Sequence, residues 1–167
     1  VQPRAAMGVN VAGSVVAEML VEVFQAASCQ LSWNPASATQ LDVQNGYDTP
    51  EQLCADRWAA LLGVSGHFPK AHAPLVLATF GTATTIDTLS PKKRFEGGLI
   101  LPGPALMRQS LAQGTANLPL ASGVGSDYPT HTLQAIATGV VAAQAGAVWR
   151  QCEITRQRFG VAPILCV

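Results

Sequence analysis

An acidic and a basic side chain stand next to each other in this sequence, at Asp56 and Arg57. A carboxylate can accept the proton of an attacking hydroxyl group while a phosphoryl group is transferred. A guanidinium offers a planar fork of donors that suits a carboxylate or a phosphate. The pair therefore fits a general base beside an anion clamp, although an ordinary ion pair on a helix explains the same spacing.

A second candidate lies further along, where Gly81 and Thr82 open a run of residues that favour β-structure. Glycine lets the backbone approach a phosphate closely, and the threonine hydroxyl adds a donor. A plain β-hairpin would use the same residue types, and the segment lacks the lysine of a P-loop. Taken with Asp56 and Arg57, it points to a phosphotransferase that acts on a small carboxylate.

The composition limits the class of protein. The 167 residues suffice for one domain or slightly more. Only 12% of them are charged, against about 25% in ordinary soluble domains, so we expect a partner subunit or further chain to cover part of the surface. The ten basic and ten acidic side chains cancel, which leaves no field to attract nucleic acid or an anionic membrane.

The sequence gives no support for metal binding or membrane insertion. The four cysteines, Cys29, Cys54, Cys152 and Cys166, do not have the spacing of a structural zinc site. Glutamate, glutamine or glycine interrupts the apolar stretches before the roughly 20 residues that a membrane span needs. The N-terminus has no secretory leader pattern. We therefore expect a cytoplasmic protein without a metal site of its own.

Apolar periodicity and turn residues predict an α/β protein. Helices are expected over residues 10–23, 50–62, 106–111 and 132–151, with Asn10 and Thr49 as the first two N-caps. Strands are expected over residues 31–33, 75–78, 82–89, 95–101 and 163–167, the last one parallel and buried. Because the chain opens without methionine and closes on an apolar strand, we expect an interior portion of a longer protein.

Seven ordered sequence blocks make the chain resemble the type III pantothenate kinases, whose near relatives include the Bvg accessory factors. The blocks are Asn10–Gly13, Asn45–Tyr47, Leu53–Trp58, Gly81–Asp87, Gly97–Gly103, Gly114–Pro119 and Thr132–Gly139. Their common order over essentially the whole chain is far more specific than any single block.

This resemblance implies an α/β fold of the actin-like, acetate-and-sugar-kinase type, made of two ribonuclease-H-like halves and truncated here at both ends. Residues 1–70 would be the remainder of the first half, and residues 71–167 would be the second half. It also implies a homodimer that uses ATP with Mg²⁺ to phosphorylate pantothenate to 4'-phosphopantothenate, the first step of coenzyme A biosynthesis.

The resemblance assigns the centre of the site to one short segment. Asp56 matches the general base that deprotonates the pantothenate hydroxyl. Cys54, Ala55, Asp56 and Arg57 match a substrate-binding tetrad, with Arg57 placed to hold the pantothenate carboxylate. Cys54 stands where the family usually has glycine, which narrows the approach to the substrate.

Further contacts are assigned to residues elsewhere in the chain. Tyr47 and Thr132 match substrate contacts, and the helix that starts at Thr132 is expected at the dimer interface. Gly81 and Thr82 match the nucleotide side, with Thr82 at an ATP phosphate. Thr79 stands where an aspartate usually binds a monovalent cation. Because a neutral hydroxyl is a poorer ligand for a hard cation, we expect weak or no potassium dependence.

Two phosphate- and adenosine-binding motifs of the family are expected outside residues 1–167. We therefore expect these residues alone to bind pantothenate but to transfer little or no phosphate. A second interpretation stays open, namely a catalytically weak or inactive accessory protein with a regulatory role. Asp56 and Arg57 favour the enzyme, whereas Thr79 favours the regulatory relative. DNA binding is a third and less favoured interpretation, because the net charge is zero and the sequence contains no basic recognition helix.

Overall fold

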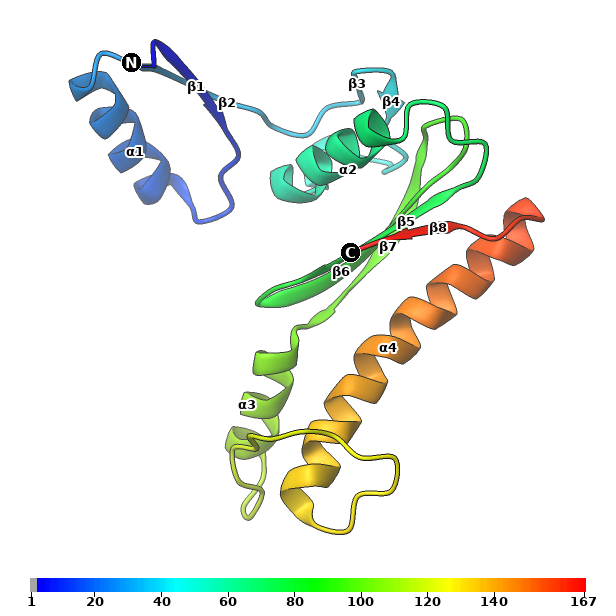
Figure 1. The fold of residues 1–167 in the computed structure, drawn as a ribbon. Helices are drawn as coiled ribbons and strands as arrows, with labels where there is room; N and C mark the ends of the chain where they lie inside the picture. Colours follow the sequence, from blue (N-terminus) through cyan, green and yellow to red (C-terminus); the bar gives the residue numbers. More distant parts are fainter. Residues whose placement is uncertain (1–2) are drawn as a thin grey trace. The chain divides into compact units, whose positions relative to one another are not determined.

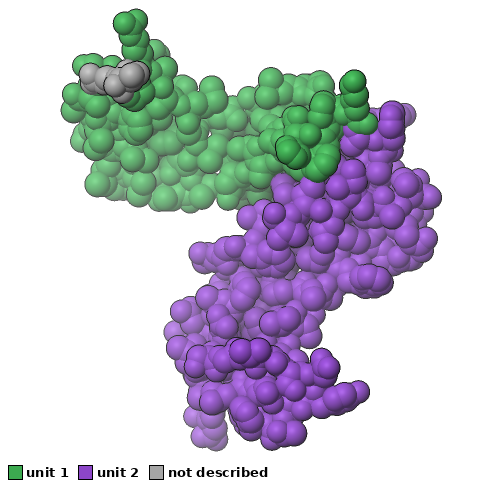
Figure 2. All heavy atoms as spheres, in the orientation of Figure 1, with its two compact units in different colours: residues 1–70, 93–96 green, residues 71–92, 97–167 purple. Residues whose placement is uncertain are grey.

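The computed structural model describes residues 3–167, which contain both α-helices and β-strands (Figure 1). The chain forms two compact units (Figure 2). Unit 1 holds the residues up to 70 together with 93–96, and unit 2 holds 71–92 and 97–167. The predicted α/β class is confirmed. The assignment of residues 1–70 and 71–167 to two ribonuclease-H-like halves stays a prediction.

Unit 1 begins with two short parallel strands, β1 (Ala5–Gly8) and β2 (Gln30–Trp33). Helix α1 (Ser14–Ala26) connects them, as parallel pairing requires a crossover. None of the residues of α1 is buried, and the apolar side chains of Val15 and Met19 are 68% and 60% exposed.

Asn10 does not cap α1, so the sequence prediction was wrong there. The helix starts after Gly13, whose φ of 92° is a conformation that favours glycine. The Asn10 side chain instead accepts the N–H of Ala12 (3.0 Å) and donates to the carbonyl of Gly13 (2.8 Å). Its side chain thus builds the turn that precedes the helix.

The rest of unit 1 is a hairpin followed by a helix. Strands β3 (Thr39–Gln40) and β4 (Val43–Gln44) are antiparallel. The two residues between them both have positive φ, as in a type I′ turn. A 3₁₀ turn, η1 (Pro50–Gln52), then leads to helix α2 (Ala55–His67).

The predicted helix over residues 50–62 is therefore two elements. Leu53 has the extended conformation (φ −72°, ψ 126°) and separates η1 from α2, and Thr49 makes no side-chain capping bond. Gly63 and Gly66 do not end α2, which continues to His67. Burial of Leu53 and of the apolar face of α2 outweighs the low helix propensity of the two glycines.

Unit 2 is built on a four-stranded sheet with the order β7-β6-β5-β8. Strand β5 (Leu75–Phe80) pairs antiparallel with β6 (Ala83–Leu89) and parallel with β8 (Ile164–Cys166). The parallel strand near residue 164 was predicted correctly. It is an edge strand rather than a buried one, since Leu165 is 47% exposed.

Strand β7 (Phe95–Pro102) begins in unit 1 and continues in unit 2. It leads into helix α3 (Pro104–Gly114), and a long connection then reaches helix α4 (Thr132–Phe159). Helix α4 packs against the sheet of unit 2. Its residues Ala147, Val148 and Cys152 contact a core of Val76, Ala78 and Ile86.

Helix α4 is longer than the sequence predicted, because it runs through Gln151 to Phe159. It ends at Gly160, whose φ of 71° lets its N–H bond the carbonyl of Arg156. By length and composition this helix could cross a membrane. In unit 2 part of one face of this helix packs against the sheet. The prediction that no membrane is involved stays a prediction.

Candidate functional site

The loop that carries Tyr47 is fixed by the side chain of Asn45, which is buried. Its Nδ2 donates to the carbonyl of Pro50 (3.1 Å), and its Oδ1 accepts the N–H of Tyr47 (3.1 Å). Asparagine readily forms such turns with the backbone two residues on. The loop therefore has a defined course, and Tyr47 is held half-buried at its tip.

Arg57 reaches this loop from the first turn of α2. Its Nη1 donates to Tyr47 Oη (3.1 Å), and its guanidinium carbon lies 5.9 Å from the centre of the Tyr47 ring and 5.8 Å from that of Phe95. Only 5% of Arg57 is exposed. A cation so close to aromatic faces is attracted by their quadrupoles, most strongly when it is shielded from water. We call Tyr47, Arg57 and Phe95 the cation–aromatic cluster.

The helix itself is anchored by the next residue, Trp58, which is fully buried. Its Nε1 donates to Gln40 Oε1 in strand β3 (2.8 Å). Gln40 in turn donates from Nε2 to Asn34 Oδ1 (2.8 Å). These bonds satisfy the buried indole and fix the N-terminal turn of α2 to the β3–β4 hairpin.

Asp56 differs from its neighbour because its side chain is exposed. Its Oδ1 accepts the backbone N–H of Arg57 (2.8 Å), a bond that orients the carboxylate at the start of the helix. Cys54, at the N-cap position, is also exposed, and Ala55 is half-buried. The structure thus brings Tyr47 and the predicted tetrad together in unit 1, with an accessible carboxylate beside a buried guanidinium.

The second candidate segment forms the turn between β5 and β6 in unit 2. Gly81 and Thr82 are exposed there. The turn is braced by Gly103, whose N–H donates to the Thr82 carbonyl (2.9 Å). A Cβ atom on Gly103 would lie 2.0 Å from the Gly81 carbonyl oxygen, so only glycine permits this approach. Thr79, also exposed, lies opposite Thr85 in the β5–β6 ladder.

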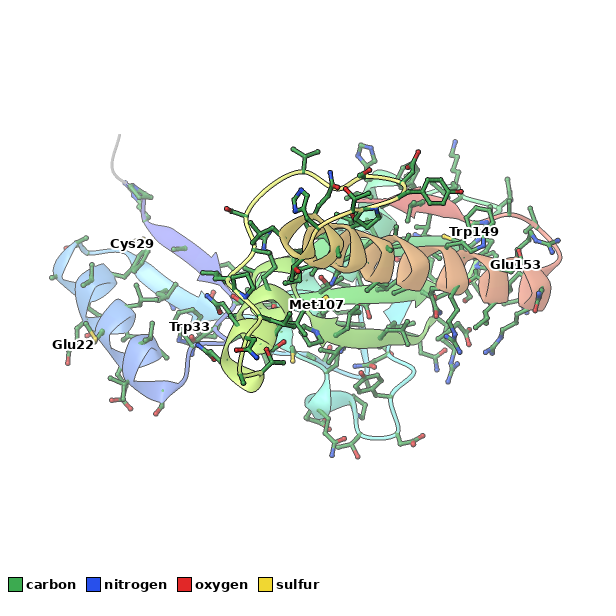
Figure 3. The ribbon with its side chains drawn as sticks, turned by 90° about the horizontal axis from the view of Figure 1, so that it is seen from below. Glu22, Cys29, Trp33, Met107, Trp149 and Glu153 are labelled. Carbon is green, nitrogen blue, oxygen red and sulfur yellow. The ribbon has the colours of Figure 1, made fainter. Side chains whose placement is uncertain are left out.

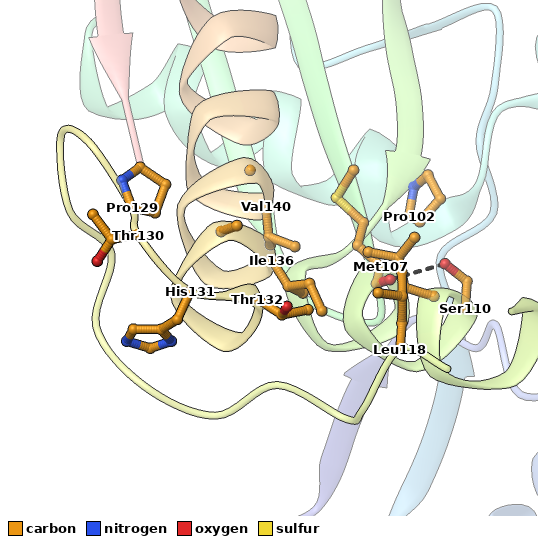
Figure 4. A pocket seen from close by; sticks show the side chains of 13 residues that line it. Pro102, Met107, Ser110, Leu118, Pro129, Thr130, His131, Thr132, Ile136 and Val140 are labelled. Atoms are coloured by element: carbon orange, nitrogen blue, oxygen red, sulfur yellow. Dashed lines mark hydrogen bonds between the residues drawn. The ribbon is translucent and has the colours of Figure 1, made fainter. Parts of the chain in front are cut away.

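Thr132 is the first residue of α4, after the capping residue His131, whose Nδ1 accepts the N–H of Gln134 (3.4 Å). It lines a cavity of about 780 Å³ in unit 2 (Figure 4). The other lining residues, mostly apolar, come from the end of β7, from α3, from the α3–α4 connection and from α4: Pro102, Met107, Ser110, Leu111, Leu118, Pro129, Thr130, His131, Ala135, Ile136, Gly139 and Val140. The volume suits a small organic molecule or a side chain of another protein.

Two smaller cavities lie beside the C-terminal half of α4 in unit 2, next to Trp149 and Glu153, and beside the middle of α1 in unit 1, next to Glu22 and Trp33. Figure 3 labels these four side chains. Within residues 3–167 no group of three or more His, Cys, Asp or Glu side chains could hold a metal ion.

Sequence reasoning missed Phe95 and Asn45 as parts of the site. Phe95 looked like an ordinary strand residue, and its contact with Arg57 joins positions far apart in the chain. Asn45 had a local signal, because Asn-Gly is a strong turn dipeptide, but nothing in the sequence showed that the turn would carry Tyr47 towards α2.

Comparison with known proteins identifies the family. The model of the type III pantothenate kinase family matches residues 1–154. The chain belongs to the type III pantothenate kinase family. Among curated family members, a type III pantothenate kinase of Bordetella pertussis is 52% identical over 166 residues, and one of Aromatoleum aromaticum is 42% identical over 147 residues. These alignments cover 99% and 88% of this chain, but 62% and 60% of those kinases.

This family member thus spans about three fifths of the length of the curated kinases that it matches. A solved Campylobacter jejuni protein of the Baf family has a similar fold, with a TM-score of 0.60 and 22% identity. That likeness covers 99% of this chain and 67% of the solved one. The family resemblance found in the sequence is confirmed.

Proposed function

We propose that this protein, with ATP, phosphorylates pantothenate to 4'-phosphopantothenate at the start of coenzyme A biosynthesis, in the cytoplasm. The type III pantothenate kinases of two Bordetella species, 52% and 51% identical to this chain, support that substrate. We further propose the actin-like fold of two ribonuclease-H-like halves, consistent with the mixed sheet of unit 2.

One observation carries the proposal: Asp56, with an exposed carboxylate, directly precedes Arg57, whose guanidinium is held by Tyr47 in the first turn of α2. Asp56 would accept the proton of the pantothenate hydroxyl as this oxygen attacks the γ-phosphate. Arg57 would bind the pantothenate carboxylate, and its burial strengthens such an ion pair because little water competes. Tyr47 would line the same subsite, and Cys54 and Ala55 would bound the approach to it.

The nucleotide side would use the exposed β5–β6 turn. Gly81 would let the backbone come close to a phosphate, and the Thr82 hydroxyl would donate to it. Mg²⁺ would arrive with the nucleotide, since this ion is commonly held by substrate phosphates and few protein ligands.

We propose a homodimer with α4 at its interface. Trp149 and Val141 on this helix are 76% and 62% exposed, which is unusual for large apolar residues on a helix that also covers a sheet. Thr132 would contact pantothenate from the cavity at the start of α4. Neither a nucleic acid nor a membrane is part of the proposal.

Substitution of the carboxylate tests the proposal. In a coupled assay of ATP consumption on the full-length protein, turnover should require pantothenate. Asp56→Asn should lower kcat by about 10²–10⁴-fold, the usual contribution of a general base, and leave pantothenate binding nearly unchanged. Glu22→Gln, which removes an exposed carboxylate elsewhere in unit 1, is the control. Unchanged turnover of Asp56→Asn would remove Asp56 as the base.

A regulatory role is the second candidate, and Thr79 is the observation that favours it. The hydroxyl pair of Thr79 and Thr85 offers a hard monovalent cation weaker ligands than a carboxylate would. An active enzyme should therefore respond weakly to potassium in place of sodium or lithium. Strong activation by potassium would contradict this, and absence of pantothenate-dependent ATP consumption would favour the regulatory role.

A further inference from the structure

We propose that Phe95 is a positioning residue for substrate binding, because its ring holds the Arg57 guanidinium in the orientation that receives the substrate carboxylate. This inference rests on the proposed function, in which Arg57 binds that carboxylate. Phe95 would not touch the substrate itself. It is fully buried at the start of β7 and acts through the cation above it.

The distances within the cation–aromatic cluster show how the support works. The Tyr47 and Phe95 ring centres are 5.3 Å apart and the rings are tilted by 34°. The guanidinium carbon is 5.9 Å from one centre and 5.8 Å from the other. The three separations are similar, so the guanidinium and the two rings are all neighbours of one another. The bond from Nη1 to Tyr47 Oη adds a directional contact to this packing.

The backbone around Phe95 is fitted closely to the Tyr47 loop. A Cβ atom on Gly46 would lie 1.9 Å from the Phe95 carbonyl oxygen, so the loop and β7 approach as closely as only glycine allows. The N–H of Gln44 donates to the carbonyl of Lys93 (2.9 Å), and Gln44 bridges to Arg94. Asn45 holds the other side of the loop. The two rings are therefore placed by the backbone and not only by their mutual contact.

A guanidinium held in this way loses little conformational freedom when a carboxylate binds. Preorganisation of this kind favours ground-state binding as much as binding of the transition state. Loss of the Phe95 ring should therefore raise the KM for pantothenate and leave kcat nearly unchanged. A general loss of stability would instead reduce the amount of active protein and would not be specific to one substrate.

The test uses Phe95→Leu, which keeps an apolar side chain of similar size, and Phe95→Tyr, which keeps the ring. In the full-length protein, Phe95→Leu should raise the KM for pantothenate about tenfold, within the range expected for loss of a desolvated cation–π contact. Its kcat and its KM for ATP should change by less than about twofold. Phe95→Tyr should restore the KM. An alcohol analogue of pantothenate that lacks the carboxylate should show no difference between the variants.

Leu61→Val is the matched control, since Leu61 is also fully buried in unit 1 but lies outside the cluster. An equal rise in KM in this control, or an unchanged KM in Phe95→Leu, would overturn the inference. Nuclear magnetic resonance relaxation of the Arg57 Nε–Hε bond supplies a measurement that does not depend on activity. We expect a rigid bond in the unaltered protein and in Phe95→Tyr, and a mobile one in Phe95→Leu. Equal rigidity in all three would also overturn it.

These measurements separate the inference from the proposed function. An unaltered protein without pantothenate-dependent turnover would contradict the function, whereas an active one whose Phe95→Leu variant keeps its KM would contradict the inference alone. Direct titration of pantothenate onto Phe95→Leu gives the same comparison as a binding constant, with about tenfold weaker binding expected.

Discussion

The two units hold their candidate site residues by different means. In unit 1, Arg57 is placed by side chains, namely by the rings of Tyr47 and Phe95 and by a hydrogen bond to Tyr47. In unit 2, the Gly81–Thr82 turn is placed by main-chain atoms, since the N–H of Gly103 bonds the Thr82 carbonyl and no side chain fits between.

This difference predicts that the two sites respond to different kinds of substitution. The Arg57 guanidinium in unit 1 should respond to removal of the side-chain atoms that contact it. The unit 2 turn should tolerate loss of its exposed side chains but should respond to a single added methyl group. Substitutions that shorten or lengthen one side chain at a time therefore test the comparison directly.

The largest effect is expected from Trp58→Ala in unit 1. This residue is fully buried and its indole N–H bonds Gln40, so its truncation should cost about 3–5 kcal/mol of the free energy of unfolding. Tyr128→Ala in unit 2 is the control, because Tyr128 is 88% exposed and its truncation should cost less than about 0.5 kcal/mol. Urea denaturation of both variants measures the difference, and equal costs would break the comparison.

Gly103→Ala should have the next largest effect. Its Cβ would lie 2.0 Å from the Gly81 carbonyl oxygen, and such overpacking should cost about 1–3 kcal/mol and displace the turn. In α4, a Cβ atom on Gly146 would have no neighbour within 4 Å. Gly146→Ala should therefore raise the free energy of unfolding by up to about 1 kcal/mol, because alanine has the higher helix propensity. Thermal denaturation measures both. A raised KM for ATP in Gly103→Ala alone would sharpen the assignment of this turn to the nucleotide.

Tyr47→Phe removes the hydroxyl that accepts from Arg57 and keeps the ring. Loss of this hydrogen bond should cost about 0.5–1.5 kcal/mol of stability. Tyr128→Phe, at a residue that is 88% exposed, should change nothing measurable. A cost near zero for Tyr47→Phe would mean that this hydrogen bond does not help to hold the cation.

The smallest effect concerns Glu153 on α4, whose pKa is lowered to about 2 by hydrogen bonds from Arg156 and Gln157. Because the pKa of Glu153 is lower in the folded state, its ionised form stabilises the fold at pH values above the ordinary pKa of 4.5. This contribution to stability is lost as the pH falls towards 2. Because the group is exposed, salt should weaken the effect. Arg156→Gln should raise the pKa of Glu153, as a carboxyl titration by nuclear magnetic resonance would show; an unchanged pKa would exclude this pairing in solution.

Local signals predicted most of the elements correctly. The β5–β6 hairpin and the pairing of β8 with β5 agree with the strands read from branched apolar runs and from the final apolar segment. The errors lie at helix ends. Asn10 is a residue type that favours the N-cap position, but its side chain bonds the turn before α1 instead. The glycines of α2 did not end that helix, because the burial of its apolar face outweighed their low helix propensity.

The candidate site was predictable only where its residues are adjacent in sequence. The pair Asp56 and Arg57 stood out in the sequence, and the resemblance to the family assigned the Cys54–Arg57 segment. The contact between Arg57 and Phe95 could not, because it depends on the β4 segment meeting the start of β7. The burial of Arg57 was also unforeseen, since a charged residue beside an exposed aspartate reads as a surface pair.

The bare apolar stripe of α1 has a practical consequence for work at the bench. Helix α1 exposes the apolar side chains of Val15, Met19 and Val23 to water on one face. Exposed apolar surfaces promote self-association as the protein concentration rises. Kinetic and scattering measurements should therefore be made over a series of protein concentrations. At a single concentration, self-association would change the measured activity and the measured molecular size.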